Sequence, residues 1–185
     1  MKIVSNEVQS PRQQGRTEAI ILFAVAGQTF AIAASAVAEI RSTDSLSSAA
    51  SAMVVNGISK VRHRLRRGTK WYYVVDTCVH FDLPASRPSL LLILRNSTIA
   101  VLVDQIDRIE TISRLMAVPQ SFSGPERTWY RGLALIDDNV VPILSPSGFL
   151  TRSELAQLDA FAEPAATFEE RETSLFPSET QRPLP

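Results

Sequence analysis

Short apolar runs separated by turn-forming residues occupy most of this chain, which is the pattern of a protein built from short β-strands. Two brief segments, 35–41 and 104–110, have apolar residues at the spacing expected of a short helix. Loops are predicted at 42–51 and 121–125, and a hairpin turn at 137–139. The predicted strands, with 111–118 as a strand or extended segment, are 19–26, 28–34, 53–65, 70–77, 89–95, 98–103, 129–136 and 139–144.

The pattern of strand, turn, strand and short helix occurs twice, about 69 residues apart. In this register Gly27 aligns with Asn96, and Ile40 aligns with Ile109. Glycine and asparagine are the residues that most readily take positive φ in a hairpin turn. The sequence therefore predicts a duplicated β unit and a mainly β protein with two lobes.

A second pair of matches extends the repeat but reveals a difference between the halves. Asn56-Gly57-Ile58-Ser59 resembles Arg131-Gly132-Leu133-Ala134, and a β-rich run follows each. Gly57 lies 17 positions before Val74, whereas Gly132 lies 8 positions before Val140. This register predicts that the first half carries extra chain at 60–70, the most basic stretch of the protein.

The ends of the chain differ in composition from its middle. Thr151-Arg152-Ser153-Glu154 is a capping box, and the apolar face of the helix that follows it is predicted to carry Leu155, Leu158, Phe161 and Ala162. The Pro-flanked segment 83–88 is the expected crossing between the lobes. The predicted organisation is a flexible leader (1–17), a folded region (18–150) with lobes of about 18–87 and 88–150 between which strands can cross, a helix (151–162) and a disordered tail (163–185).

Composition favours an intracellular, cytoplasmic protein. The chain is 45% hydrophobic and has one cysteine, Cys78, which rules out an intramolecular disulfide. The apolar stretch at 19–30 is too short to span a bilayer. Charge is balanced overall, with 19 basic and 19 acidic residues, but residues 1–92 carry a net +5 and residues 93–185 a net −5. Such asymmetry helps a protein to orient on a charged partner without identifying that partner.

No residues form a pattern typical of catalysis, cofactor binding or a metal site. His63 and His80 have no second ligand at metal-binding spacing. Cys78 and His80 would share one face of a strand, but they lack the third partner of an activated nucleophile. An enzyme built on this pair is the least favoured hypothesis, and we expect no catalytic residue, cofactor or metal.

The basic stretch has an alternating pattern. On a strand, Lys60, Arg62, Arg64 and Arg66 would share one face, with Val61 and Leu65 on the other. Such a charged face is most often simply solvated. As a functional surface it could dock an acidic protein, or it could serve a β-barrel module that binds nucleic acid. The nucleic-acid alternative is weaker, because the run lacks interleaved aromatic residues and the chain is neutral.

Several short motifs, in this order and spacing, resemble the CheW-like domain of bacterial chemosensory systems over roughly residues 18–150. The motifs are Phe23, Gly27, Val37-x-Glu39-Ile40, Gly57-Ile58 with Arg62, Val74-Val75-Asp76, Val101-Leu102-Val103-Asp104 with Ile106, and Arg131-Gly132-Leu133-Ala134. The resemblance implies two five-stranded, SH3-like β-barrel lobes. It also implies a non-enzymatic adaptor that couples chemoreceptors to the histidine kinase CheA.

The resemblance also carries expectations for the binding residues. Family members use lobe surfaces to bind the regulatory domain of the kinase and a groove between the lobes to bind the tip of a methyl-accepting receptor. By position, Val37, Glu39 and Arg62 would lie at or near the receptor groove, and Arg64 and Arg66 extend the candidate receptor- or kinase-binding surface. The family places Arg-Gly closely before a Pro-Val-x-Asp strand, whereas Tyr73 stands here at the proline position. An alternative register therefore takes Arg67-Gly68 as the Arg-Gly pair. No nucleic-acid partner is expected from this resemblance.

Overall fold

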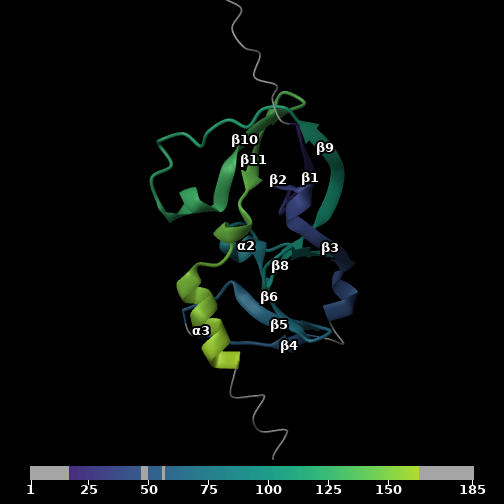
Figure 1. Ribbon diagram of the computed structural model, residues 1–185, viewed down its shortest axis with the longest axis vertical. Coiled ribbons are helices and arrows are strands. Elements are labelled where there is room, and N and C mark those ends of the chain that lie inside the picture. The colour runs from purple at the N-terminus through teal and green to yellow at the C-terminus, as the bar shows by residue number, and fades with distance from the viewer. Residues whose placement is uncertain (1–16, 47–49, 56, 163–185) are drawn as a thin grey trace, which may run out of the picture.

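The computed structural model describes residues 17–46, 50–55 and 57–162. The predicted leader, apart from Thr17, and the predicted tail at 163–185 lie outside the described residues. The described chain forms two β lobes stacked along the long axis of the molecule (Figure 1). We refer to them as the upper and lower lobes, as they appear in that view. The mainly β architecture predicted from the sequence is confirmed.

Each lobe is one sheet that takes strands from both halves of the chain. The upper lobe, in spatial order, consists of β10 (Tyr130–Ile136), β11 (Asn139–Leu144), β2 (Gln28–Ala33), β1 (Glu18–Val25) and β9 (Gln105–Ile112). The lower lobe consists of β3 (Val37–Ser42), β7 (Leu90–Leu94), β8 (Ile99–Val103), β6 (Lys70–Val75), β5 (Val61–Arg67) and β4 (Ala50–Ala52). The short β4 adds a sixth strand to the five that were predicted for this lobe.

Tight turns with positive φ connect the hairpins, as the sequence predicts. Gly27 (φ 78°) closes the β1–β2 hairpin, and Asn96 (φ 53°) lies in the turn between β7 and β8. The β10–β11 turn places both Asp137 (φ 47°) and Asp138 (φ 62°) in the left-handed region. Two such residues in a two-residue turn match the right-handed twist of the strands they join.

An offset of 69 residues relates the two halves throughout the fold. The β5–β6 and β10–β11 hairpins start at Val61 and Tyr130, have strands of equal length, and are each closed by two residues. The third strand of each half crosses over, so that β3 pairs with β7 and β9 pairs with β1. We call two residues separated by this offset repeat-equivalent. The halves are therefore interlocked, each completing the other's sheet.

The extra chain predicted at 60–70 is not an insertion relative to the second half. Gly57 (φ 84°) lies in a turn before β5, whereas Gly132 lies inside β10, where a side chain would collide with Leu115 and the Met116 carbonyl. The two glycines thus have different structural roles. The repeat-equivalent of Gly132 is His63, and the two hairpins have the same length.

The short helices predicted at 35–41 and 104–110 are wrong. A 3₁₀ turn, η1 (Ala34–Ala36), is followed directly by strand β3, and Gln105 begins the long strand β9. The i, i+3 spacing of apolar residues in these segments fits a helix locally. Hydrogen bonding to the free edge of the other half's hairpin overrides that local preference.

The core is divided into one cluster between the lobes and one smaller cluster in each sheet. The inter-lobe cluster contains repeat-equivalent residues from both halves, such as Phe23 with Leu92 and Ile32 with Val101. The two smaller clusters also correspond, since Leu22, Ala31, Val141 and Ile143 in the upper lobe match Leu91, Ala100, Tyr72 and Val74 in the lower lobe. Alternate residues of the same strands thus fill the lobe interior and the joint between lobes.

A C-terminal helix, α3 (Arg152–Ala162), packs on the lower lobe (Figure 1). The predicted capping box is present, because Thr151 N donates to Glu154 Oε2 (2.7 Å) and Glu154 N donates to Thr151 Oγ1 (3.2 Å). Leu158 is fully buried in the inter-lobe core. The remaining short helices are η2 (Thr43–Ser45), α2 (Thr77–His80), η3 (Pro125–Trp129) and η4 (Pro146–Gly148). Within the described residues, no helix has the length and apolar content needed to cross a membrane.

Candidate interaction surface

Glu39 on β3 is the centre of an ion-pair cluster at the edge of the lower lobe. Its carboxylate contacts Arg67 at the end of β5 (2.5 Å) and Arg41 on its own strand (3.1 Å). Glu39 Oε2 is buried and accepts no hydrogen bond of good geometry, so the ion pairs compensate its charge. Strands β7, β8 and β6 separate β3 from β5 in the sheet. The sheet therefore curls enough for β3, one of its edge strands, to meet the end of β5, which lies next to the short edge strand β4.

The upper lobe has a corresponding contact with the charges exchanged. Arg108 on β9, the repeat-equivalent of Glu39, forms an ion pair with Asp137 in the β10–β11 turn. Arg108 also contacts Glu110 (3.1 Å) and Asp107 (2.9 Å). In each lobe an ion pair thus joins a crossover strand to the tip of a hairpin. The acidic residue is on the crossover strand in the lower lobe and on the hairpin tip in the upper lobe.

Val37 supports the Glu39 strand from inside the molecule. Its side chain is 7% exposed and belongs to the inter-lobe core. Arg95, in the β7–β8 turn, donates to the carbonyls of Ser35 (3.2 Å) and Val37 (3.3 Å). Val37, which was predicted as a binding residue, therefore supports β3 from the core, and its side chain is not available for contact with a partner.

Arg62 lies apart from Glu39, at a bulge in β5. The pairing of β5 with β6 shifts register between Val61 and His63, so Arg62 has no partner opposite it. The predicted alternation is wrong for this reason: Val61 points into the inter-lobe core, whereas Leu65 points into the core of the lower lobe. The arginine that reaches Glu39 is Arg67, which precedes Gly68 (φ 58°).

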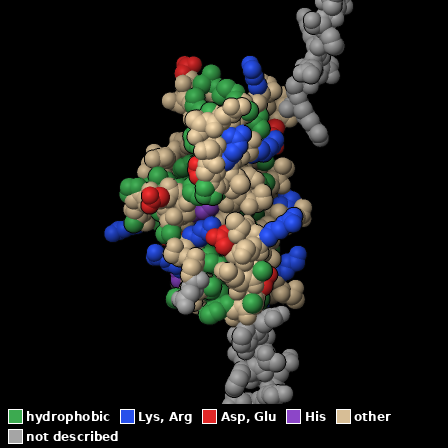
Figure 2. Space-filling view, turned by 90° about the vertical axis from the view of Figure 1, so that its left-hand side faces the viewer, with side chains coloured by type: hydrophobic (Ala, Val, Ile, Leu, Met, Phe, Trp, Pro, Cys, Tyr) green, Lys and Arg blue, Asp and Glu red, His purple; other side chains and the backbone are tan. Residues whose placement is uncertain are grey.

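Most basic residues of the β5–β6 hairpin have partners within the chain. Arg64 lies over the Trp71 ring, 4.3 Å from its centroid, and Arg66 lies 5.8 Å from it. Lys60 pairs with Glu154 of α3 (2.9 Å). The face drawn in Figure 2 carries scattered Lys and Arg side chains with no continuous basic stripe. These contacts give little support to the nucleic-acid alternative, which needs a continuous basic track.

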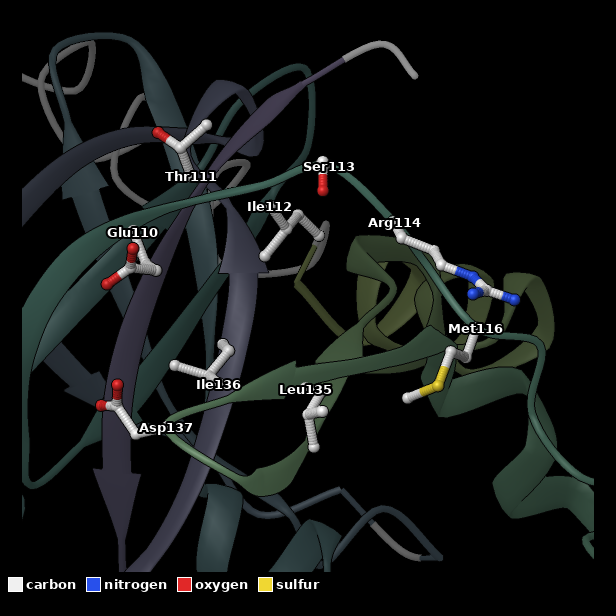
Figure 3. Close-up of a pocket in the computed structure, with 9 residues that line it drawn as sticks. All are labelled: Glu110, Thr111, Ile112, Ser113, Arg114, Met116, Leu135, Ile136 and Asp137. Atoms are coloured by element: carbon white, nitrogen blue, oxygen red, sulfur yellow. The ribbon is translucent and has the colours of Figure 1, made fainter. Parts of the chain in front are cut away.

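A pocket with a volume of about 350 Å³ lies at the edge of the upper lobe. Its wall consists of the end of β9, the segment that follows it, and the end of β10 (Figure 3). Glu110 and Asp137 lie on one side of the pocket, and Arg114 and Met116 lie on the other. No sequence pattern predicted this site. The loop that completes it is attached to β10 by backbone hydrogen bonds between Met116 and Leu133, and these do not depend on the residue types.

Large apolar side chains are exposed on the outer faces of both lobes. Leu135 (61% exposed) and Val140 (59%) are cross-strand partners on β10 and β11. Ile109 on β9 and its repeat-equivalent Ile40 on β3 are also exposed. Exposed apolar side chains with charged neighbours are typical of protein–protein contact surfaces.

Cys78 and His80 do not form a catalytic pair. They lie on α2, not on the predicted strand, and residues two positions apart on a helix do not share a face. Cys78 Sγ contacts Ser86 Oγ (3.2 Å). His80 is 5% exposed and packs against Phe81, Trp129 and Phe149, with ring centroids 4.5–5.4 Å apart. Burial lowers the pKa of His80 to about 4, and nearby Lys60 adds to this effect.

Asp104 connects the lobes at the β8–β9 crossover. One carboxylate oxygen accepts a hydrogen bond from the Ala26 backbone N–H (2.6 Å), in the upper lobe. The other accepts from Ser86 Oγ (2.5 Å), in the segment that joins the two halves. Asp104 N donates in turn to the Ala24 carbonyl (2.9 Å). The relative position of the lobes is thereby fixed by a buried core and by this polar joint.

The family comparison matches a CheW-like domain over residues 19–154, which includes both lobes and the start of α3. The chain belongs to the CheW-like domain family. Among solved structures, it is similar to the scaffolding protein TtCheW from Thermoanaerobacter tengcongensis, with 15% identity and a TM-score of 0.61. That match covers 74% of this chain and 95% of the other. A comparison with curated proteins gave no match.

Membership of the CheW-like family assigns the protein to chemotaxis signal transduction as an adaptor or scaffold. CheW proteins are scaffold proteins without enzymatic activity. Among the described residues, no group of three or more His, Cys, Asp or Glu side chains is placed to hold a metal ion.

Proposed function

We propose that this protein is a non-enzymatic adaptor that couples a methyl-accepting chemoreceptor tip to a CheA-type histidine kinase. The observation that carries the proposal is the match to the CheW-like domain across both lobes, over residues 19–154. An adaptor of this kind must hold two proteins at once, and therefore needs two separate surfaces on a rigid body.

The receptor surface is proposed to follow β3, around Glu39 and Arg67. The ion pair between these residues closes the edge of the lower lobe, and 44% of the neighbouring Ile40 side chain is exposed. A receptor helix could pack on Ile40 and compete for the charges of Glu39 and Arg67. Both side chains are partly exposed, at 29% and 45%, so a partner can reach this pair from solvent.

The kinase surface is proposed to be the outer face of β10 and β11. Leu135 and Val140 form an exposed apolar pair there, on the lobe opposite to Glu39. The regulatory domain of the kinase would bury this pair on binding. Burial of two aliphatic side chains contributes on the order of a few kcal/mol to association, enough to affect affinity strongly.

Separate binding measurements would test this assignment. By isothermal titration calorimetry, Glu39→Arg is expected to weaken binding of the receptor tip and leave binding of the kinase regulatory domain unchanged. Leu135→Asp combined with Val140→Asp is expected to do the reverse. Wild-type protein that binds neither partner would refute the coupling function. If either variant affected both partners equally, the assignment of two separate surfaces would be wrong.

A further inference from the structure

The β5–β6 hairpin holds two guanidinium groups against one indole ring. Arg64 lies 4.3 Å from the centroid of the Trp71 ring, and Arg66 lies 5.8 Å from it. Arg64 and Arg66 are two positions apart on β5 and therefore share one face of the strand, while Trp71 lies opposite Arg66 in the ladder. Because both guanidinium groups contact the same ring, they lie close to each other. We call these three residues the hairpin cluster.

The positive charge of the hairpin cluster is not neutralised by a carboxylate in the described part of the chain. Arg67 pairs with Glu39, but no ion pair reaches Arg64 or Arg66 there, and Arg66 Nε donates to the neutral carbonyl of Gly68 (3.2 Å). From Val61 to Val75 the hairpin contains no acidic residue. Two like charges beside one ring repel each other, so an anion that contacts both is favoured at this position.

Helix α3 runs alongside this hairpin in the direction of β5. Near the start of the helix, Glu154 pairs with Lys60, which precedes β5, at 2.9 Å. Further along the helix, Asp159 accepts a hydrogen bond from the Tyr73 hydroxyl (2.6 Å), and Tyr73 lies opposite Arg64 in the β5–β6 ladder. The helix therefore passes from the level of Lys60 to the level of Arg64.

The C-terminal end of α3 points towards the hairpin cluster. Ala162, the last residue of the helix, is three residues beyond Asp159, a rise of about 4.5 Å. Trp71 lies on the same face of β6 as Tyr73 and is displaced from it in the same direction, towards the hairpin tip. The chain thus leaves α3 on the side of the lobe where the two guanidinium groups lie.

The sequence that follows α3 has the opposite charge to the hairpin. Residues 163–172 contain Arg171 as the one basic residue, and their acidic residues are Glu163, Glu169, Glu170 and Glu172. Glu169 is seven residues beyond Ala162, and seven residues span up to about 25 Å when extended. Chain length therefore allows these carboxylates to reach the hairpin cluster from the end of α3.

We propose that the acidic segment 163–172 of this chain docks on the hairpin cluster and covers it. Its glutamates pair with Arg64 and Arg66, since guanidinium groups bind carboxylates through paired, charge-assisted hydrogen bonds. The segment is assigned in preference to an acidic partner protein because α3 delivers it to the cluster. A short tether gives it an effective concentration in the millimolar range, so even a weak contact is occupied.

The inference goes beyond the proposed adaptor function, because it makes the basic face of this hairpin a surface that the chain covers by itself. A partner that binds the hairpin cluster must then displace the acidic segment. The proposed receptor and kinase surfaces lie elsewhere, on β3 and on β10–β11, and the test below uses neither partner. Failure of the coupling function and failure of this inference are therefore distinguishable.

The test measures fluorescence anisotropy of a labelled peptide of residues 163–172 titrated with the full-length chain. It compares wild type with a segment variant that combines Glu163→Gln, Glu169→Gln, Glu170→Gln and Glu172→Gln. The segment variant is expected to bind the peptide about tenfold more tightly than wild type, because in wild type the tethered segment competes for the site. A peptide with the same four substitutions is the reference and is expected not to bind either protein.

Further substitutions in the segment variant locate the site. Arg64→Gln and Arg66→Gln are each expected to weaken peptide binding about tenfold, the effect of losing one charge-assisted contact. Arg114→Gln, at an exposed arginine of the upper lobe, is the matched control and is expected to leave the affinity unchanged.

Three results would overturn the proposal. Equal affinity of wild type and the segment variant would show that the surface is open to acidic peptides and that the chain does not cover it. Absence of peptide binding to the segment variant would show that the cluster does not hold this segment. Unchanged affinity after Arg64→Gln and Arg66→Gln would place the peptide elsewhere on the protein.

Discussion

Glu39 on β3 and Arg67 on β5 form an ion pair at 2.5 Å, although three strands lie between β3 and β5 in the hydrogen-bonded order of the lower sheet. Their repeat-equivalent region in the upper lobe uses Arg108 and Asp137, with the signs of charge reversed. A contact that recurs in both lobes with inverted polarity has a structural role that either order of charges can fill. The order of charges can therefore differ between the lobes, and a partner protein can use this difference to distinguish one lobe from the other.

Reversing the pair separates these two roles. Glu39→Arg or Arg67→Glu alone places two like charges together and is expected to lower the unfolding free energy by about 1 kcal/mol. The double exchange is expected to restore stability, because opposite charges again meet across the edge. Binding of the receptor tip is expected to remain weak in the double variant. Urea denaturation and calorimetry on the four proteins check this cycle, and recovery of receptor binding in the double variant would show that the receptor does not distinguish the order of the two charges.

Asp104 is expected to be the most sensitive polar residue of the joint between the lobes. Asp104→Ala leaves the Ala26 N–H and the Ser86 hydroxyl without their acceptor, at a cost of about 2–3 kcal/mol. Asp107→Ala is the matched control, because Arg108 keeps Glu110 and Asp137 as partners. Equilibrium unfolding in urea measures both, and equal effects would contradict the role assigned to Asp104.

His80 predicts a loss of stability in mild acid. Its pKa is about 4 in the folded protein and near 6.5 when unfolded, so the unfolded chain binds the extra proton first as pH falls. The unfolding free energy is therefore expected to decrease between about pH 6.5 and pH 4, by up to roughly 3 kcal/mol. In His80→Phe this part of the decrease should be missing.

His63→Gln is the control for that comparison, since it removes the only other histidine and leaves the aromatic cluster intact. Urea unfolding at a series of pH values measures all three proteins. A wild-type profile no steeper than that of His80→Phe would show that the imidazole is not held neutral by burial.

Leu158 connects α3 to the core between the lobes. Because the side chain is fully buried, Leu158→Ala is expected to lower the unfolding free energy by about 3 kcal/mol. Phe161→Ala, on the same helix with 54% of the side chain exposed, should change it by less than about 1 kcal/mol. Thermal unfolding followed by circular dichroism compares the two, and similar values would mean that α3 does not contribute to the core as its packing indicates.

Local sequence patterns predicted the hairpins well because their information lies within a few residues. Gly27 and Asn96 both have the positive φ that their residue types allow, and the capping box at Thr151 and Glu154 forms as expected. The repeat offset of 69 residues was also visible, because it rests on these turns. The same local signal underlies the resemblance to CheW-like domains, which the family comparison confirms.

The crossover strands and the bulge could not be predicted in the same way. Ile40 lies on a strand because β3 pairs with β7, and Ile109 lies on a strand because β9 pairs with β1. In both cases the partner strand comes from the other half of the chain, more than 40 residues away. The bulge at Arg62 changes which face Val61 occupies, and no single residue marks it. The contact between Glu39 and Arg67 depends on both features. From the sequence, Arg67 could be identified only as the arginine that precedes Gly68.

Size-exclusion chromatography of a three-component mixture tests most directly whether this protein holds a receptor tip and a kinase together. The receptor tip, the CheA-type kinase from the same organism and this protein are expected to elute as one complex. Removing this protein, or replacing it with the Leu135→Asp, Val140→Asp variant, should separate the kinase from the receptor fraction. Co-elution of receptor and kinase to the same extent without this protein, or failure of the three to co-elute at all, would contradict the coupling function.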